Sequence, residues 1–332
     1  MTEATAPIAR VRTADERWAA IGFVVMVAIF AIAPAVVYPI FLMNVLCMAL
    51  FACAFNLLIG FGGLLSFGHA MFLGMAGYVS AHAAKVWGLP PELAIAAGTA
   101  TAALLGIVAG LLAIRRQGIY FAMITLALAQ MVYFFCLQAP FTHGEDGIQA
   151  VPRGKLFAVL DLDNLWVLYY VVLAIFAAAF LLIYRTVHSP FGQVLKAIRE
   201  NESRATSLGY DINRYKLLAF VLSATLAGLA GSLNALVLGF ATLSDVQQST
   251  SGEVILMTLL GGTGTFFGPV VGAAIIVTLQ HYLSDLVGGW VTAIIGVIFV
   301  ACVLSFRRGI VGELEALRLR RAAAPTRPAA PA

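Results

Sequence analysis

Residues 40–59 read IFLMNVLCMALFACAFNLLI, and this stretch settles the class of fold. Its 20 residues include no charged side chain, and as an α-helix they rise about 30 Å, the thickness of a bilayer's hydrocarbon core. The whole chain has the same character. Of its 332 residues, 61% are hydrophobic and 11% are charged, whereas a soluble domain carries about 25% charged residues. The sequence therefore predicts an all-α polytopic membrane protein and argues against a soluble enzyme or a disordered chain.

Further apolar runs lie on both sides of this stretch. We expect about ten membrane helices or half-helices, at 18–38, 40–59, 67–84, 92–114, 118–138, 164–184, 215–238, 252–261, 269–284 and 288–306. The run at 252–261 would reach only about 15 Å as a helix. It is therefore expected to be a half-helix that dips into the membrane, although a full crossing leaves the sidedness unchanged.

The basic residues predict the orientation. With the N-terminus in the cytoplasm, 17 of the 20 lysines and arginines fall on the cytoplasmic side, and only Lys85, Arg153 and Lys155 fall on the other. Positive charge is enriched in cytoplasmic segments, so both termini are expected inside. This gives a cytoplasmic tail at 1–17, a membrane permease domain at 18–306 with a cytoplasmic loop at 185–216, and a partly disordered cytoplasmic tail at 307–332.

Several kinds of chemistry lack their usual residues. No carboxylate lies at the centre of an expected span, which argues against a proton-coupled transporter because a relay needs a titratable group at depth. No histidine pair has metal-ligand spacing, and the glycine-rich stretch 261–269 lacks the lysine of a phosphate-binding loop. The chain is thus expected to bind no metal or cofactor and not to be an enzyme. Any ATP and magnesium would be held by a partner.

Two glycine-rich stretches interrupt the apolar pattern. Glycine costs about 1 kcal/mol in a helix interior, and broken backbone inside a membrane persists only where protein or a water-filled cavity satisfies it. The breaks are candidates for a transport pathway, with an ordinary cytoplasmic turn as the alternative, which is about equally favoured for the first break. The pathway candidates are Gly60, Gly62, Gly63, Gly68, Gly261, Gly262, Gly264, Gly268 and Pro269.

The cytoplasmic loop at 185–216 contains a predicted amphipathic helix. Ser189-Pro190 is a helix-start signal, and Val194, Leu195 and Ile198 then share one face. A second short helix is expected after Asn201, closed by glycine. Such a pair is suited to docking into a groove of a partner protein. The alternative, a helix lying on the anionic inner leaflet, is weakened by the acidic residues of the loop.

Three motifs resemble one family. The run GQVLKAIRENESRATSLGYDINRYKLLAFVLSATLAGLAGS at 192–232 closely resembles the permease subunits of branched-chain amino acid ABC importers, the LivM type of the LivH and LivM permeases. NLLIGFGGLLSFGH at 56–69 and GGTGTFFGPVVGA at 261–273 support this resemblance, which covers about 40–312. By this resemblance the helix that couples to the ATPase would lie within 190–211, with the candidates Pro190, Gly192, Leu195, Ala197, Ile198, Glu200, Asn201, Ala205, Leu208 and Gly209.

The resemblance also implies partners and a function. The chain would work in the inner membrane, among lipid, with a second homologous permease, two cytoplasmic ATPase subunits and a periplasmic binding protein that meets 139–163 and 239–251. No nucleic acid is expected to bind. The expected function is ATP-driven import of branched-chain amino acids, or of a related small amino-acid-like solute, by alternating access. Relatives that move urea, short amides or aromatic acids leave the solute open, because His143 departs from a glycine pair of the family. A self-contained secondary transporter or channel is the alternative from another class.

Overall fold

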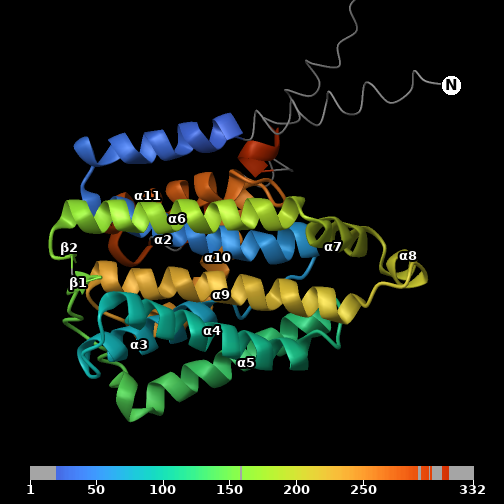
Figure 1. The fold of residues 1–332 in the computed structure, drawn as a ribbon, viewed down its shortest axis with the longest axis horizontal. Coiled ribbons are helices and arrows are strands. Elements are labelled where there is room, and N and C mark those ends of the chain that lie inside the picture. The colour runs from blue at the N-terminus through green and yellow to red at the C-terminus, as the bar shows by residue number, and fades with distance from the viewer. Residues whose placement is uncertain (1–19, 158, 291–292, 299, 301–308, 314–332) are drawn as a thin grey trace, which may run out of the picture.

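The computed structural model describes residues 20–157, 159–290, 293–298, 300 and 309–313. Over these residues the chain is an all-α membrane protein (Figure 1). The predicted tail at 1–17 and most of the tail at 307–332 lie outside them. After a helical stretch at 20–32, the helices are α2 (Pro39–Asn56), α3 (Ala70–Lys85), α4 (Pro91–Ala113), α5 (Ile119–Gln138), α6 (Leu165–His188), α7 (Pro190–Glu200), α8 (Glu202–Ser207), α9 (Ile212–Leu238), α10 (Gln248–Gly261) and α11 (Gly268–Val287).

Five helical segments in the described part are long and apolar enough to cross a membrane. They are Pro39–Phe61, Pro91–Ala113, Ile119–Gln138, Leu165–His188 and Ile212–Leu238, and Ala20–Ala35 and Gly268–Ser284 are shorter apolar helices. All seven coincide with expected spans, so these predictions are confirmed. The last expected span, 288–306, is described only as a short helical turn at Gly288–Trp290 and a helical stretch at 293–298.

The helix that contains the opening stretch, α2, lies at the centre of the molecule. It packs against α6, α9, α10 and α11, and its large side chains Phe51 and Phe55 are fully buried. On the other side of α9, small residues let α3 and α4 approach closely. A Cβ added at Gly231 would lie 1.9 Å from the carbonyl oxygen of Leu73, and one at Gly228 would lie 2.2 Å from Ala102 Cβ. Close helix packing through small residues is the usual solution in membranes.

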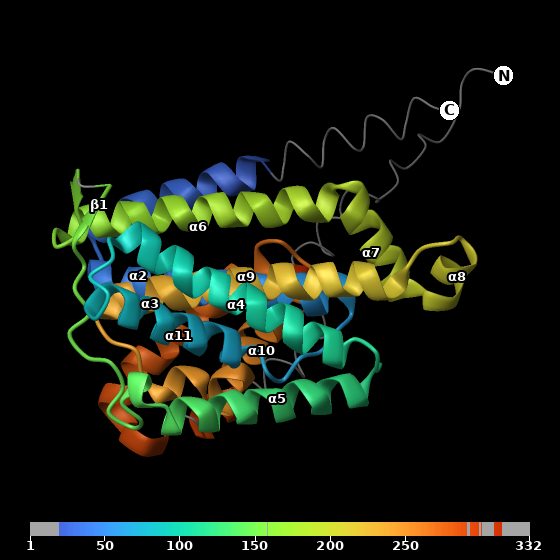
Figure 2. The ribbon, with the colours of Figure 1, turned by 60° about the horizontal axis from the view of Figure 1, so that its bottom comes forward.

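The two ends of the bundle differ (Figure 2). One end carries α7 and α8. The other carries a two-stranded sheet of β1 (Lys155–Leu156) and β2 (Leu160–Asp161). At the sheet's end the loops at 139–163 and 239–251 meet, because Ile148 and Ala241 form a β-bridge. The predicted cytoplasmic loop therefore lies at the opposite end from the loop at 139–163 and from Ala241. The rest of the 239–251 segment is not an outer loop, because Gln248–Ser251 form the first turn of α10.

Two segments are only partly helical. After α2, a π-helical turn at Leu57–Phe61 and a non-helical stretch lead to α3. After α9, the chain passes through a short 3-10 turn at Leu243–Val246 before α10 begins. The starts of α3 and α10 meet where the Ala70 backbone N–H donates to Ser251 Oγ at 2.9 Å.

The structure lengthens the expected half-helix and corrects one inference from it. Because α10 begins at Gln248 and has 14 residues, it rises about 21 Å rather than about 15 Å. The expected helix is shorter because it is located from its run of apolar residues, and the first turn of α10 is polar. Glu253, expected at the end of the short apolar run at 252–261, is instead the sixth of the 14 residues of α10, so its expected place at a helix end is wrong.

Candidate functional site

The predicted coupling helix forms as α7. Ser189 caps its N-terminus, where Ser189 Oγ accepts from the Gly192 backbone N–H at 3.4 Å, and Pro190 occupies the first turn. Proline fits there because that N–H has no partner within the helix. A Cβ at Gly192 would lie 2.3 Å from the Val187 carbonyl oxygen. Only glycine therefore lets α7 turn so closely off the end of α6.

The predicted coupling residues divide into two sets by burial. Gly192, Leu195, Ile198 and Ala205 are buried and hold the two short helices against the bundle. The exposed set is Pro190, Ala197, Glu200, Asn201, Leu208 and Gly209. Leu208 is the most exposed large apolar side chain of this set, at 70%. The exposed set is therefore the part that a partner protein could contact.

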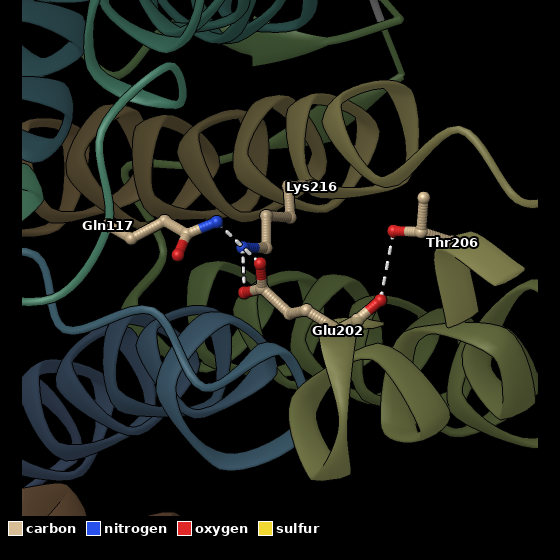
Figure 3. Close-up of polar contacts among 4 residues, drawn as sticks. All are labelled: Gln117, Glu202, Thr206 and Lys216. Atoms are coloured by element: carbon tan, nitrogen blue, oxygen red, sulfur yellow. Dashed lines mark hydrogen bonds and ion pairs between the residues drawn. The ribbon is translucent and has the colours of Figure 1, made fainter. Parts of the chain in front are cut away.

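An ion pair fixes α8 to the neighbouring helices (Figure 3). The Lys216 ammonium of α9 contacts the Glu202 carboxylate, and Gln117 Nε2, from the turn between α4 and α5, donates to the same carboxylate at 2.5 Å. The Lys216 side chain is only 3% exposed, so it needs this partner, since an unpaired buried charge is costly. The predicted second short helix is also confirmed, since α8 begins after its N-cap Asn201 and Gly209 follows it at φ 86°.

The first glycine break lies at the inner end of α2. Gly60 belongs to the π-helical turn, Gly62 follows it, and Gly63 has a φ of 68° that favours glycine. Gly68 precedes α3 and packs against α5, where a Cβ would lie 2.2 Å from the Thr125 carbonyl oxygen. These residues cannot carry larger side chains without moving their neighbours.

The second break joins α10 to α11. Gly261 ends α10 and touches Gly268, since a Cβ on Gly261 would lie 1.9 Å from the Gly268 carbonyl oxygen. Gly262 and Gly264 have φ values of 119° and 78°. Pro269 lies in the first turn of α11, as the helix-start pattern requires.

One asparagine connects the two breaks. Asn56 Nδ2 donates to the Thr265 carbonyl oxygen at 2.8 Å, and Asn56 Oδ1 accepts from the Gly264 backbone N–H at 2.9 Å. Asn56 is 3% exposed. Gly60 lies alongside, where a Cβ would be 2.6 Å from the Gly264 nitrogen. The Asn56 side chain, next to the first break, thus hydrogen-bonds to the backbone of the second break, which lies about 200 residues away in the chain.

Arg199 attaches α7 to this same place. Its guanidinium donates to the Gly60 carbonyl oxygen, one of the last carbonyls of the helical segment that ends at Phe61. A cation is favourable at a helix C-terminus. The arginine stem passes over Gly63, where a Cβ would lie 2.9 Å from Arg199 Cγ. We call Asn56, Gly60, Arg199, Gly264 and Thr265 the inner junction.

Aromatic contacts surround the inner junction. Lys196 of α7 lies over the Phe61 ring, with Nζ 5.5 Å from its centroid, and partial burial lowers the pKa of Lys196 below its ordinary value. Phe61 contacts Phe266 of the second break at 5.3 Å between centroids. Phe266 in turn stacks on His188 at the end of α6, at 5.1 Å. The end of α6, α7 and both breaks therefore form one packed unit.

The structure brings together the two predicted groups that the sequence treats separately, the coupling loop and the glycine breaks. The side chains that join them, Asn56 and Arg199, are absent from the predicted set, as is Glu202. A lone asparagine within an apolar run is a signal that a buried polar partner exists, but the run does not say where. No three His, Cys, Asp or Glu side chains gather as metal ligands within the described ranges.

Comparison with known proteins gives the family. The model of the branched-chain amino acid transport system permease component matches residues 37–303. The high-affinity branched-chain amino acid transport permease LivM of Escherichia coli K12 is 28% identical over 253 residues, covering 69% of this chain and 60% of the relative. The probable LivH permease of Methanocaldococcus jannaschii is 25% identical over 239 residues, 69% of each chain.

A shorter match is to a permease that is named for another solute. The autoinducer 2 import permease LsrC of Klebsiella pneumoniae is 34% identical over 119 residues, 34% of each chain. No solved structure matches. The family model covers most of the chain, including α2, both glycine breaks, α7 and the inner junction. The chain therefore belongs to the family of permease components of branched-chain amino acid transport systems, and it is similar to the LivM type within that family.

Proposed function

We propose that this chain is the permease subunit of an ATP-driven importer that moves branched-chain amino acids across the inner membrane by alternating access. The membrane part would be 18–306, paired with a second homologous permease. Two cytoplasmic ATPase subunits and a periplasmic binding protein would complete the complex. ATP and magnesium would be bound by the ATPases, and this chain would supply no catalytic residue.

The observation that carries this proposal is the attachment of α7 to the inner junction. An ATPase that moved α7 through its exposed residues would pull directly on the Gly60 carbonyl through Arg199. Because Asn56 ties the first break to the second, both breaks would move with α7. Glycine-rich backbone can absorb such a change in φ and ψ at low cost. The inner junction is thus suited to transmit a motion of α7 to the membrane helices.

The solute is assigned from the family. Three relatives that each match over 69% of this chain are named for branched-chain amino acid transport. The shorter matches are named for autoinducer 2 and xylose. Leucine, isoleucine and valine are accordingly the first solutes to test, with xylose as the comparison.

A pull-down tests the complex. The tagged chain is purified from its own membranes in mild detergent, as wild type and as Ala197→Glu, and the co-purifying proteins are identified by mass spectrometry. Ala197 is exposed on α7, so the new charge should disturb partner binding and not folding. Gln149→Glu, exposed at the opposite end, is the control.

We expect the wild type and Gln149→Glu to recover an ATPase and a second permease, and Ala197→Glu to lose the ATPase alone. Recovery of the chain by itself, in a detergent that keeps a known ABC importer complex intact, would instead support a self-contained transporter.

A further inference from the structure

The face where α5, α10 and α11 meet is polar. Gln130 of α5, Gln248, Ser249 and Glu253 of α10, and Gln280 of α11 lie here, and all are at least partly exposed. Gln130 Nε2 donates to Gln248 Oε1 at 3.3 Å, and the Gln280 side chain lies beside the Glu253 carboxyl group. We call these five residues the α10 polar face.

This face lies at depth in the membrane. Gln130 is the twelfth of the 20 residues of α5, so it lies about 17 Å from one end of that helix and about 12 Å from the other. Gln280 is the thirteenth residue of the 20 in α11. Both helices are apolar, and Gln130 and Gln280 each lie beside a residue of α10. The first two turns of α10 therefore lie well inside the hydrocarbon layer.

Lipid does not suit such a face. The exposed surface of α4 presents Leu104, Val108 and Leu111, which is what contact with acyl chains requires. Ionised and strongly polar side chains within a membrane are costly and face a protein partner or a water-filled cavity. Glu253 is the one described carboxylate that lies more than a turn from both ends of a membrane helix. Its neighbour Gly252 faces open space, since no atom of the described residues lies within 4 Å of an added Cβ.

We propose that the α10 polar face lines the path of the transported solute, and that the Glu253 carboxylate contacts a positively charged ammonium group of that solute as it passes. This inference rests on the proposed function and adds to it the residues of the path. Gln280 lies beside the carboxyl group, and the open space beside Gly252 leaves room for a ligand. A carboxylate and a glutamine amide are the groups that recognise the ammonium of a free amino acid.

The first experiment tests the path without requiring any solute. Single cysteines are placed at Ser249 and Gly252, and as lipid-facing controls at Leu104 and Val108, in the assembled complex in membrane vesicles. A charged, membrane-impermeant methanethiosulfonate reagent is then applied, with and without a non-hydrolysable ATP analogue. Only a water-exposed thiol ionises and reacts readily, and the wild type measures the background from native cysteines, of which Cys47, Cys53 and Cys136 are buried.

We expect Ser249→Cys and Gly252→Cys to react about tenfold faster than the two α4 variants in at least one nucleotide state. Reaction no faster than that of Leu104→Cys in both states would overturn the assignment of the path. This result does not depend on which solute is carried, so a failure of leucine transport and a failure of the path are separate outcomes.

The second experiment tests the carboxylate. Uptake of radiolabelled leucine into proteoliposomes is measured for Glu253→Gln, Glu253→Asp and the control Glu92→Gln, whose carboxyl group is at the outer end of α4. We expect Glu253→Gln to lower uptake about tenfold, the effect of losing one charge-assisted contact, with partial recovery in Glu253→Asp and an unchanged amount of assembled complex. Wild-type uptake by Glu253→Gln would overturn the role of Glu253.

Discussion

Replacing Asn56 by alanine should destabilise the protein more than replacing any other buried asparagine. The substitution removes two hydrogen bonds, from Asn56 Nδ2 to the Thr265 carbonyl and from the Gly264 N–H to Asn56 Oδ1. It also leaves those two half-buried backbone groups unpaired. Each of the two bonds contributes about 1 kcal/mol, and each unpaired group adds about 0.5 kcal/mol, less than the about 1–3 kcal/mol of a fully buried group because water reaches it in part. We therefore expect the free energy of unfolding to fall by about 3 kcal/mol.

Asn234→Ala is the matched control. Asn234 is also 3% exposed, but its side-chain oxygen has no hydrogen-bond partner among the described residues, so its removal orphans nothing there. The loss should be about 1 kcal/mol, from packing alone. Both variants are unfolded by titration with sodium dodecyl sulfate from mixed micelles and followed by circular dichroism. Equal losses for Asn56→Ala and Asn234→Ala would refute the argument that Asn56 holds the two breaks together.

Five further substitutions, two of them controls, test other parts of the site. Gly60→Ala would place a methyl group 2.2 Å from Asn56 Oδ1 and should lower the free energy of unfolding by about 1–3 kcal/mol. Gly252→Ala, which adds its methyl group in open space, should not lower the free energy of unfolding. The same titration measures both variants, and equal effects would contradict the contact at Gly60. Glu202→Gln leaves a buried lysine unpaired and should cost about 1–3 kcal/mol, less than a fully buried pair because the Glu202 side chain is 34% exposed. The arginine partner of Asp211 is 83% exposed, so Asp211→Asn should cost less than about 1 kcal/mol. A larger loss of stability in Asp211→Asn than in Glu202→Gln would contradict the importance given to the ion pair of Glu202 with Lys216. Leu208→Ser should leave stability within about 0.5 kcal/mol of wild type yet reduce the ATPase recovered in a pull-down; undiminished recovery would remove Leu208 from the docking surface.

The sequence predicts most of the membrane helices because hydrophobic length is a local signal. The start of α7 follows from Ser189-Pro190, and the end of α8 follows from Gly209, because capping chemistry needs particular residues at particular places. The glycine breaks are equally visible, since clustered glycine ends a helix wherever it occurs.

The contacts of the inner junction could not be predicted in the same way. Asn56 bonds to a carbonyl 209 residues away, and a single sequence carries no signal for that distance. Arg199 lies on the polar face of an amphipathic helix, where it looks like any solvated charge. The first turn of α10 is polar. A helix located from its run of apolar residues therefore begins too late, and Glu253 falls at its end.

The central claim is that α7 transmits the work of an ATPase to the membrane helices through the inner junction. The most direct test measures leucine uptake and ATP hydrolysis together, in the same proteoliposomes, for wild type, Arg199→Met and the exposed control Arg214→Met. We predict that Arg199→Met still hydrolyses ATP but imports about tenfold less leucine per ATP, equivalent to about 1.4 kcal/mol of lost coupling, whereas Arg214→Met matches wild type. An unchanged ratio of leucine to ATP in Arg199→Met would contradict the account.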